Sequence, residues 1–224
     1  MEPRESRAVT NRWPLISGIV ALVVAVSLGG LIAARNSGSP LGVDLGWLDA
    51  MLNYRSDALD ALSLFLDWLG GGIVGIFVVP IVTVIVLCLL RRMWAALYYL
   101  IAAIASAGAV QLLKGLYLRP RPEDIMVVAD VGSFPSGHVA NAATIAVTLG
   151  IIVGRTWVWA AGAVYTVLMM VARTYLGAHW ISDTVGGLLV GAGVAIIVWA
   201  PFAARIAAER ERLSNRPAVT RTSE

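Results

Sequence analysis

The sequence predicts an all-α, polytopic membrane protein, a bundle of six transmembrane helices with both termini in the cytoplasm. Hydrophobic residues make up 58% of the 224 residues and charged residues 14%, and the mean hydropathy is +0.79. Several apolar runs have about eighteen residues or more, enough to cross a hydrocarbon layer about 30 Å thick. This composition excludes an ordinary soluble domain.

Six apolar runs are expected to be transmembrane helices. They cover residues 14–34, 69–90, 94–116, 137–154, 157–172 and 184–204. Residues 14–208 then form one membrane domain, between a cytoplasmic tail at 1–13 and a polar, arginine-rich tail at 209–224 that is expected to be disordered. The first run is longer than a typical signal-peptide core, so we interpret it as a retained anchor rather than a cleaved leader.

The segment between the first two runs is amphipathic. Its apolar residues recur at near-helical spacing among aspartates: Trp47, Leu48, Met51, Leu52, Leu59, Leu62 and Phe65. The pattern predicts a helix that lies along the outer interface with its apolar face in lipid, or one that packs over the bundle. Cys88 is the only cysteine, so no disulfide can form within the chain.

The distribution of arginines sets the orientation. Loops on one side carry Arg4, Arg7, Arg12, Arg91, Arg92, Arg155, Arg205, Arg210, Arg212, Arg216 and Arg221. By the positive-inside rule this side is cytoplasmic. The opposite side carries Arg35, Arg55, Lys114, Arg119, Arg121 and Arg173. Four of these six lie in short polar clusters, which suggests that they serve a function on the outer side.

Three clusters hold the only lysine and the only two histidines of the chain. They cover residues 114–122, 134–138 and 173–183. Each cluster lies where an apolar run ends or begins, and the predicted topology brings all three to the outer membrane face. Sequence-distant polar groups gathered at one depth are what a functional site requires.

The residue types in these clusters suit a phosphate anion. Lys114, Arg121 and Arg173 supply three cations. Ser136 and Gly137 supply a hydroxyl and backbone N–H groups at the start of a predicted helix, where the helix dipole favours an anion. Each cation taken alone also fits a side chain that extends to the lipid interface.

Two histidines and one aspartate can supply the chemistry of phosphoryl transfer. His179 and Asp183 are one helical turn apart, so the carboxylate can accept one ring proton and leave the other nitrogen as a nucleophile. His138 can then protonate the leaving oxygen and later activate water. No metal is needed in this scheme. Asp183 could instead only cap the last apolar helix.

These residues resemble the type 2 phosphatidic acid phosphatases (PAP2), which share a fold with the vanadium haloperoxidases. The family motif of Lys, six residues and Arg-Pro matches 114–122, and Pro-Ser-Gly-His matches 135–138. The third motif, Ser-Arg, five residues, His, three residues and Asp, matches 172–183 except that Ala172 stands in place of serine. The resemblance covers the chain from about Val43 onward.

The resemblance implies a role for each matched residue. His179 would form a phosphohistidine, Asp183 would orient it, and His138 would be the general acid. The implied phosphate-binding residues are Lys114, Arg121, Ser136, Gly137 and Arg173. No metal or cofactor is implied. Arg119 lacks the family spacing and either assists at the site or faces lipid headgroups.

The function predicted from the residues and the resemblance together is hydrolysis of a lipid phosphate or pyrophosphate at the outer face of a bacterial plasma membrane. The substrate would enter laterally from the bilayer, and no nucleic acid is expected as a partner. Within the family, undecaprenyl pyrophosphate and other polyprenyl phosphates are the first candidates. Phosphatidic acid and phosphatidylglycerol phosphate are the alternatives. The sequence makes no prediction of oligomeric state.

Other classes of function are also compatible with parts of the sequence. Ionisable residues in a helical bundle can mark a transport or proton path, although a relay would need groups at mid-depth. A metal-dependent hydrolase could use Glu123, Asp124 and Asp130 with the histidines. These three acids are more simply interpreted as solvated residues of an outer loop. A haloperoxidase and a catalytically inactive relative complete the alternatives.

Overall fold

The computed structural model describes residues 3–35, 38–128 and 130–214. The regular elements of these residues are helices, and the described part contains no strand, which confirms the predicted all-α class. In chain order they are α1 (Pro3–Ala33), α2 (Gly42–Asn53), α3 (Asp57–Gly70), η1 (Val74–Val78), α4 (Val79–Leu89), α5 (Met93–Tyr117), α6 (Gly137–Val153), α7 (Thr156–Tyr175), α8 (Ile181–Trp199), η2 (Ala200–Phe202) and α9 (Ala203–Ser214).

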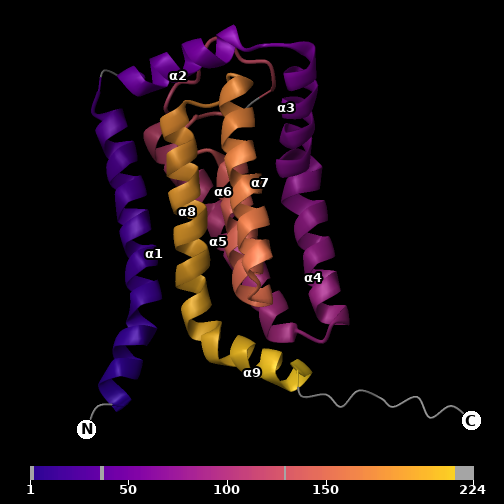
Figure 1. The fold of residues 1–224 in the computed structure, drawn as a ribbon. Helices are drawn as coiled ribbons and strands as arrows, with labels where there is room; N and C mark the ends of the chain where they lie inside the picture. Colours follow the sequence, from indigo (N-terminus) through magenta and orange to yellow (C-terminus); the bar gives the residue numbers. More distant parts are fainter. Residues whose placement is uncertain (1–2, 36–37, 129, 215–224) are drawn as a thin grey trace, which may run out of the picture.

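The long helices stand side by side, and a short helix crosses each end of the bundle (Figure 1). Helix α2 crosses one end, while α9 and the start of α1 lie at the other. Helix α8 packs against α1 and α6, and α6 also packs against α7 and α5. A Cβ added to Gly191 of α8 would lie 2.2 Å from the carbonyl oxygen of Ala140, so glycine permits the close contact of α8 with α6.

Among the described residues, four helical segments are long and apolar enough to cross a membrane: Arg12–Ala33, Met93–Tyr117, Thr156–Tyr175 and Ile181–Leu213. A bent pair, Asp57–Gly70 with Val74–Leu89, would make a fifth. Helix α6 coincides with the predicted span at 137–154, but its 17 residues give a length of only about 26 Å. Length and composition therefore support four or five spans, fewer than the six predicted.

The region between the first two predicted spans forms two helices rather than one interfacial segment. Helix α2 crosses the end of the bundle, whereas α3 runs along α7 and continues through a 42° bend into η1 and α4. The bend occurs at three consecutive glycines, of which Gly72 has a φ of +54°. Of the two interpretations of this segment, packing against the bundle describes α3, which lies along α7, and the helical path begins at Asp57 instead of residue 69.

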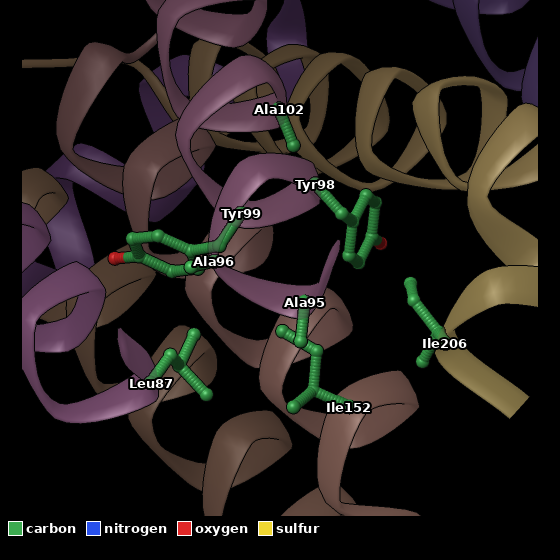
Figure 2. Packing of buried hydrophobic residues seen from close by; sticks show 8 residues of the cluster. All are labelled: Leu87, Ala95, Ala96, Tyr98, Tyr99, Ala102, Ile152 and Ile206. Carbon is green, nitrogen blue, oxygen red and sulfur yellow. The ribbon is translucent and has the colours of Figure 1, made fainter. Parts of the chain in front are cut away.

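A buried apolar cluster fixes α9 against the bundle (Figure 2). Its residues are Leu87, Ala95, Ala96, Tyr98, Tyr99, Ala102, Ile152 and Ile206. Ile206 of α9 is only 2% exposed, and the Tyr98 hydroxyl donates a hydrogen bond to the Ala195 carbonyl at 3.0 Å. The helix consequently continues to Ser214, beyond residue 209, where a disordered tail was predicted to begin. At the other terminus, α1 begins at Pro3, within the predicted tail.

Polar side chains of α9 also bind the ends of two neighbouring helices. The Glu209 carboxylate accepts hydrogen bonds from the backbone N–H groups of Trp94 at 2.6 Å and Ala95 at 3.2 Å, at the start of α5. The Arg210 guanidinium donates to the carbonyl oxygens of Ile151 at 2.5 Å and Ile152 at 3.2 Å, at the end of α6. These groups satisfy backbone donors and acceptors that a helix leaves unpaired at its ends.

Removal of the Glu209 carboxylate is expected to destabilise the protein. In Glu209→Ala, two N–H groups at the start of α5 lose their acceptor, and loss of a helix cap costs about 1 kcal/mol. Thermal unfolding of the purified protein in detergent should show a lower Tm than the wild type. Arg212→Ala, a change at an exposed position of the same helix, serves as the control. Equal Tm values for Glu209→Ala and the wild type would contradict the capping role.

Candidate active site

The three sequence clusters meet beneath α2. Lys114 lies in the last turn of α5, Arg173 in the last turn of α7 and Asp183 in the first turn of α8. The Ser136 N–H, immediately before α6, donates to the Asp183 carbonyl at 3.0 Å. Asp44 of α2 accepts a hydrogen bond from the Ser182 N–H at 3.0 Å, which fixes α2 over the site.

His179 is held with a defined ring orientation in the loop between α7 and α8. Its Nδ1 lies 2.8 Å from the Ser133 carbonyl oxygen. A carbonyl can only accept, so Nδ1 carries the hydrogen and Nε2 has the free electron pair. Nε2 lies 3.4 Å from Arg121 Nη1. The ring nitrogen with nucleophilic character therefore faces a cation that is a predicted phosphate ligand.

The Asp183 carboxylate is not the nearest acceptor for His179. Asp183 Oδ2 is 3.6 Å from His179 Nδ1, beyond hydrogen-bond distance. Instead, Oδ2 accepts the Trp180 N–H at 2.9 Å, so Asp183 does cap α8. The expected direct hydrogen bond from His179 to Asp183 is replaced by one to Ser133, and the carboxylate remains as a nearby negative charge.

The pKa of the His179 imidazole lies well below its ordinary value of 6.5. Burial is the main cause, and the positive charges of Arg173, Arg121 and Lys114 add to it. Both effects disfavour the protonated ring. His179 is therefore neutral at physiological pH, as a nucleophile must be.

Arg119 forms the deepest ion pairs of the site. It is 1% exposed, and its guanidinium binds Asp183 Oδ1 at 2.5 Å and Asp44 Oδ2 at 2.6 Å. Leu118, with a φ of +46°, ends α5 in the left-handed conformation immediately before it. The motif spacing matches Arg121, and the sequence does not decide whether Arg119 assists at the site or faces lipid headgroups. In the structure, Arg119 belongs to a buried network with Asp44 and Asp183, whereas Arg121 pairs with the half-exposed Asp130.

Lys114 and Arg121 share one carboxylate. Lys114 Nζ lies 2.7 Å from both carboxylate oxygens of Asp130, and Arg121 Nη2 lies 2.7 Å from Oδ1. Burial alone would raise the pKa of Asp130, but the hydrogen bond from Lys114 and the charges of Lys114 and Arg121 outweigh it and lower this pKa. The interpretation of Asp130 as a merely solvated loop acid was wrong.

Asp67 of α3 contacts two other predicted site residues. Its Oδ1 lies 3.1 Å from His138 Nε2 and is also bound by Arg173 Nη1. A Cβ at Gly71 would lie 2.0 Å from His138 Nε2, so glycine allows His138 to approach the end of α3. The sequence placed Asp67 only among the polar positions of an amphipathic helix. No motif singled it out.

Two donors at the site are buried and unpaired. Ser136 Oγ and Arg173 Nε have no hydrogen-bond partner among the described residues. Because a buried polar group without a partner is unfavourable, both atoms are suited to bind oxygens of a ligand. Ala172, at the predicted serine position, packs in an apolar cluster with Leu66 and Val139. Its side chain thus belongs to the core.

The side chains that commonly bind metals do not form a group that could hold an ion in the part of the chain that the structure describes. In those residues no three His, Cys, Asp or Glu side chains lie together in a way that could hold one ion. Asp130 is paired with two cations, an unsuitable environment for a metal ligand. The geometry therefore gives no support to the metal-dependent alternative.

Comparison with known proteins places these motifs in a family. The family model described as the PAP2 superfamily matches residues 95–207. An undecaprenyl-diphosphatase of Sulfolobus acidocaldarius is 35% identical over 80 residues, which are 36% of this chain and 35% of that protein. Phosphatidylglycerophosphatase B of Bacillus subtilis is 28% identical over 127 residues, 51% of this chain and 63% of that protein. The matches thus span from about a third to just under two thirds of these relatives.

Two solved structures share the fold. One is the crystal structure of a transmembrane PAP2 type phosphatidylglycerolphosphate phosphatase from Bacillus subtilis, with a TM-score of 0.69 and 24% identity over 85% of this chain and 97% of that chain. The other is LpxE of Aquifex aeolicus, with a TM-score of 0.63 and 27% identity over 70% of this chain and 95% of that chain. The helical arrangement is therefore one that a solved transmembrane phosphatase also adopts.

Proposed function

Because the chain belongs to the PAP2 superfamily, we propose that it is a metal-independent membrane lipid phosphatase that acts through a phosphohistidine at His179. One observation carries the proposal. His179 donates its Nδ1 hydrogen to Ser133 and presents the unprotonated Nε2 at 3.4 Å from Arg121. A phosphoryl group bound by Arg121 would lie next to this nitrogen.

In the first step, His179 Nε2 attacks phosphorus and the bond from phosphorus to the leaving oxygen breaks. His138 gives its proton to that oxygen. The developing negative charge on the phosphoryl oxygens is stabilised by Lys114, Arg121, Arg173, the Ser136 hydroxyl and the Gly137 N–H. The buried Asp183 carboxylate, 3.6 Å from His179 Nδ1, stabilises the positive charge that forms on the ring.

In the second step, His138 takes a proton from water, and the resulting nucleophile attacks the phosphohistidine. The bond from phosphorus to Nε2 breaks, inorganic phosphate leaves and His179 is restored. Apart from water, both steps use only side chains and a backbone N–H group of the protein, so the proposed mechanism requires no metal or cofactor. For a pyrophosphate substrate the leaving group of the first step is a lipid monophosphate.

We further propose a six-span topology in which α3, η1 and α4 form one bent span and α6 a short one. The start of α1 and α9 share one end of the bundle, and the arginines of the loops favour this end as cytoplasmic. The site beneath α2 then faces the outer side of a bacterial plasma membrane. The substrate would be a membrane lipid whose headgroup enters the site from the bilayer.

Undecaprenyl pyrophosphate or another polyprenyl phosphate is our first proposed substrate, and phosphatidylglycerol phosphate or phosphatidic acid is the alternative. The test is release of inorganic phosphate from each lipid by the detergent-purified protein with EDTA present. We expect release, with the highest kcat/KM for the polyprenyl pyrophosphate. No release from any of these lipids would overturn the proposal and favour an inactive relative or a transporter.

The His179 ring is expected to stay neutral as the pH falls from 7 to 6, because its pKa lies well below 6.5. The chain has two histidines, so in His138→Gln all histidine ring signals in NMR spectra of protein labelled with ¹⁵N-histidine come from His179. The spectra should show no ring protonation above pH 6, and a midpoint at or above 6.5 would contradict the expectation. In the unfolded chain, the His179 ring binds a proton near pH 6.5, whereas in the folded protein it does not. The free energy of unfolding should therefore decrease as the pH falls below 6.5.

A further inference from the structure

The Asp130 carboxylate lies between two cations, Lys114 and Arg121, that are proposed to bind phosphate. We propose that its carboxylate is a displaceable internal competitor, which binds Lys114 and Arg121 in the empty enzyme and leaves when a phosphate anion binds. The inference rests on the proposed function, which assigns these two cations to the substrate. The contacts are 2.7 Å from Lys114 Nζ to both carboxylate oxygens and 2.7 Å from Arg121 Nη2 to Oδ1. Two carboxylate oxygens thereby take positions that two phosphoryl oxygens could take.

Exposure distinguishes Asp130 from the other carboxylates of the site. Its side chain is 54% exposed, compared with 26% for Asp67 and 0% for both Asp44 and Asp183. Asp130 lies in the loop between α5 and α6, whereas the other three lie within helices. When displaced, Asp130 can be hydrated with little movement of the bundle. The other three carboxylates have no comparable access to water.

The two cations are much less exposed than their partner. With Asp130 in contact, Lys114 is 6% exposed and Arg121 is 12% exposed. When Asp130 moves away, Arg121 keeps only uncharged hydrogen-bond partners among the described residues, such as the Ala178 and Gly132 carbonyl oxygens. A buried cation without a partner is unfavourable. The site therefore needs one anion at a time, either Asp130 or phosphate. This exchange weakens the binding of every phosphate anion and assists the departure of the inorganic phosphate product.

Competition between Asp130 and phosphate for the two cations predicts changes in binding that loss of a merely structural contact would not produce. Removal of the carboxylate should strengthen the binding of lipid substrate and inorganic phosphate by the same factor, since both compete with the same group. We expect this factor to be about tenfold, because the lost interaction consists of charge-assisted hydrogen bonds to a half-exposed group. A structural role predicts the opposite sign, with weaker binding of both anions.

The test compares Asp130→Asn with Glu123→Gln, which removes the charge of an exposed acid from the same loop. KM for the lipid and Ki for inorganic phosphate are measured for both variants and the wild type. Asp130→Asn should lower both constants about tenfold, and Glu123→Gln should leave them within about twofold of the wild type. Unchanged or higher constants in Asp130→Asn would overturn the inference. Asp130→Ala is the second variant, should Asp130→Asn not fold.

A binding measurement separates this inference from the proposed function. The increase in Tm caused by inorganic phosphate is recorded for wild type and Asp130→Asn, without any turnover. A half-maximal effect at about tenfold lower phosphate in Asp130→Asn supports the exchange even if no tested lipid is hydrolysed. If the wild type hydrolyses lipid but both proteins respond at equal phosphate concentrations, the exchange is wrong and the proposed function stands.

Discussion

Replacing His179 with alanine is expected to reduce lipid-phosphate hydrolysis by at least about 10³-fold, because the variant lacks the proposed nucleophile of the covalent intermediate. The cations Lys114 and Arg121 do not depend on the imidazole for their position, since Asp130 binds both. Phosphate should therefore still raise the Tm of His179→Ala, at concentrations within about tenfold of those for the wild type. Turnover of His179→Ala above about one percent of the wild-type rate would contradict covalent catalysis.

His138→Ala provides the matched comparison for this prediction. Loss of the general acid and base should slow turnover by about 10² to 10⁴-fold. With a pyrophosphate substrate, whose leaving group needs little protonation, the first step should persist while hydrolysis of the intermediate slows. Labelled phosphate should thus accumulate on His138→Ala and be absent from His179→Ala. Equal labelling of the two variants would mean that the histidines do not have the assigned roles.

The gathering of the site residues could be predicted because membrane topology restricts where they lie. A polar cluster at the end of one apolar run and another at the start of the next must share a membrane face. The structure does bring Lys114, Arg121, Ser136, Arg173 and His179 beneath α2. Their partners could not be predicted in the same way. Which carboxylate reaches which cation depends on packing between helices that are distant in sequence.

Asp60 and Asp67 illustrate this limit. Both lie on α3 and have similar sequence surroundings, yet the Asp60 carboxylate accepts a hydrogen bond from the Tyr175 hydroxyl, while Asp67 binds His138 and Arg173. The two residues are seven positions apart, on nearly the same face of α3, so their different depths along the bundle decide which partners each carboxylate meets. The same reasoning applies to α9, whose charged sequence predicted a disordered tail. Its helix is stabilised by contacts of Glu209 and Arg210 with the ends of other helices.

The hydrophobic pattern located the apolar helices but not the bend between α3 and α4. A run of apolar residues indicates burial in lipid or protein, and it does not specify the direction of the helix axis. The bend follows from local backbone geometry at three glycines, and a Cβ at Gly75 would lie 2.2 Å from the carbonyl carbon of Gly70. This geometry positions the end of α3, and with it Asp67, beside His138.

Arg119→Ala is expected to have the largest effect on stability, about 3 to 5 kcal/mol, because it leaves two buried carboxylates without their cation. Asp44 and Asp183 are both 0% exposed and cannot recover the lost interaction from water. Arg121→Ala is the matched control from the same Arg-Pro repeat. Its ion-pair partner Asp130 is half-exposed, so a smaller loss of stability than in Arg119→Ala is expected, together with weaker phosphate binding.

Denaturant unfolding in detergent of Arg119→Ala, Asp44→Asn and the double variant measures how far this network acts as a unit. If Arg119 mainly neutralises Asp44 and Asp183, removal of the Asp44 charge should recover part of the stability lost in Arg119→Ala, and the two changes should not be additive. Additive losses would mean that the residues stabilise the protein independently. Lysine should not replace Arg119, since one ammonium group lacks the planar fork that binds Asp44 and Asp183 through separate nitrogens. In this interpretation the two arginines of the repeat have separate roles. Arg121 binds phosphate, and Arg119 holds the Asp183 carboxylate near His179.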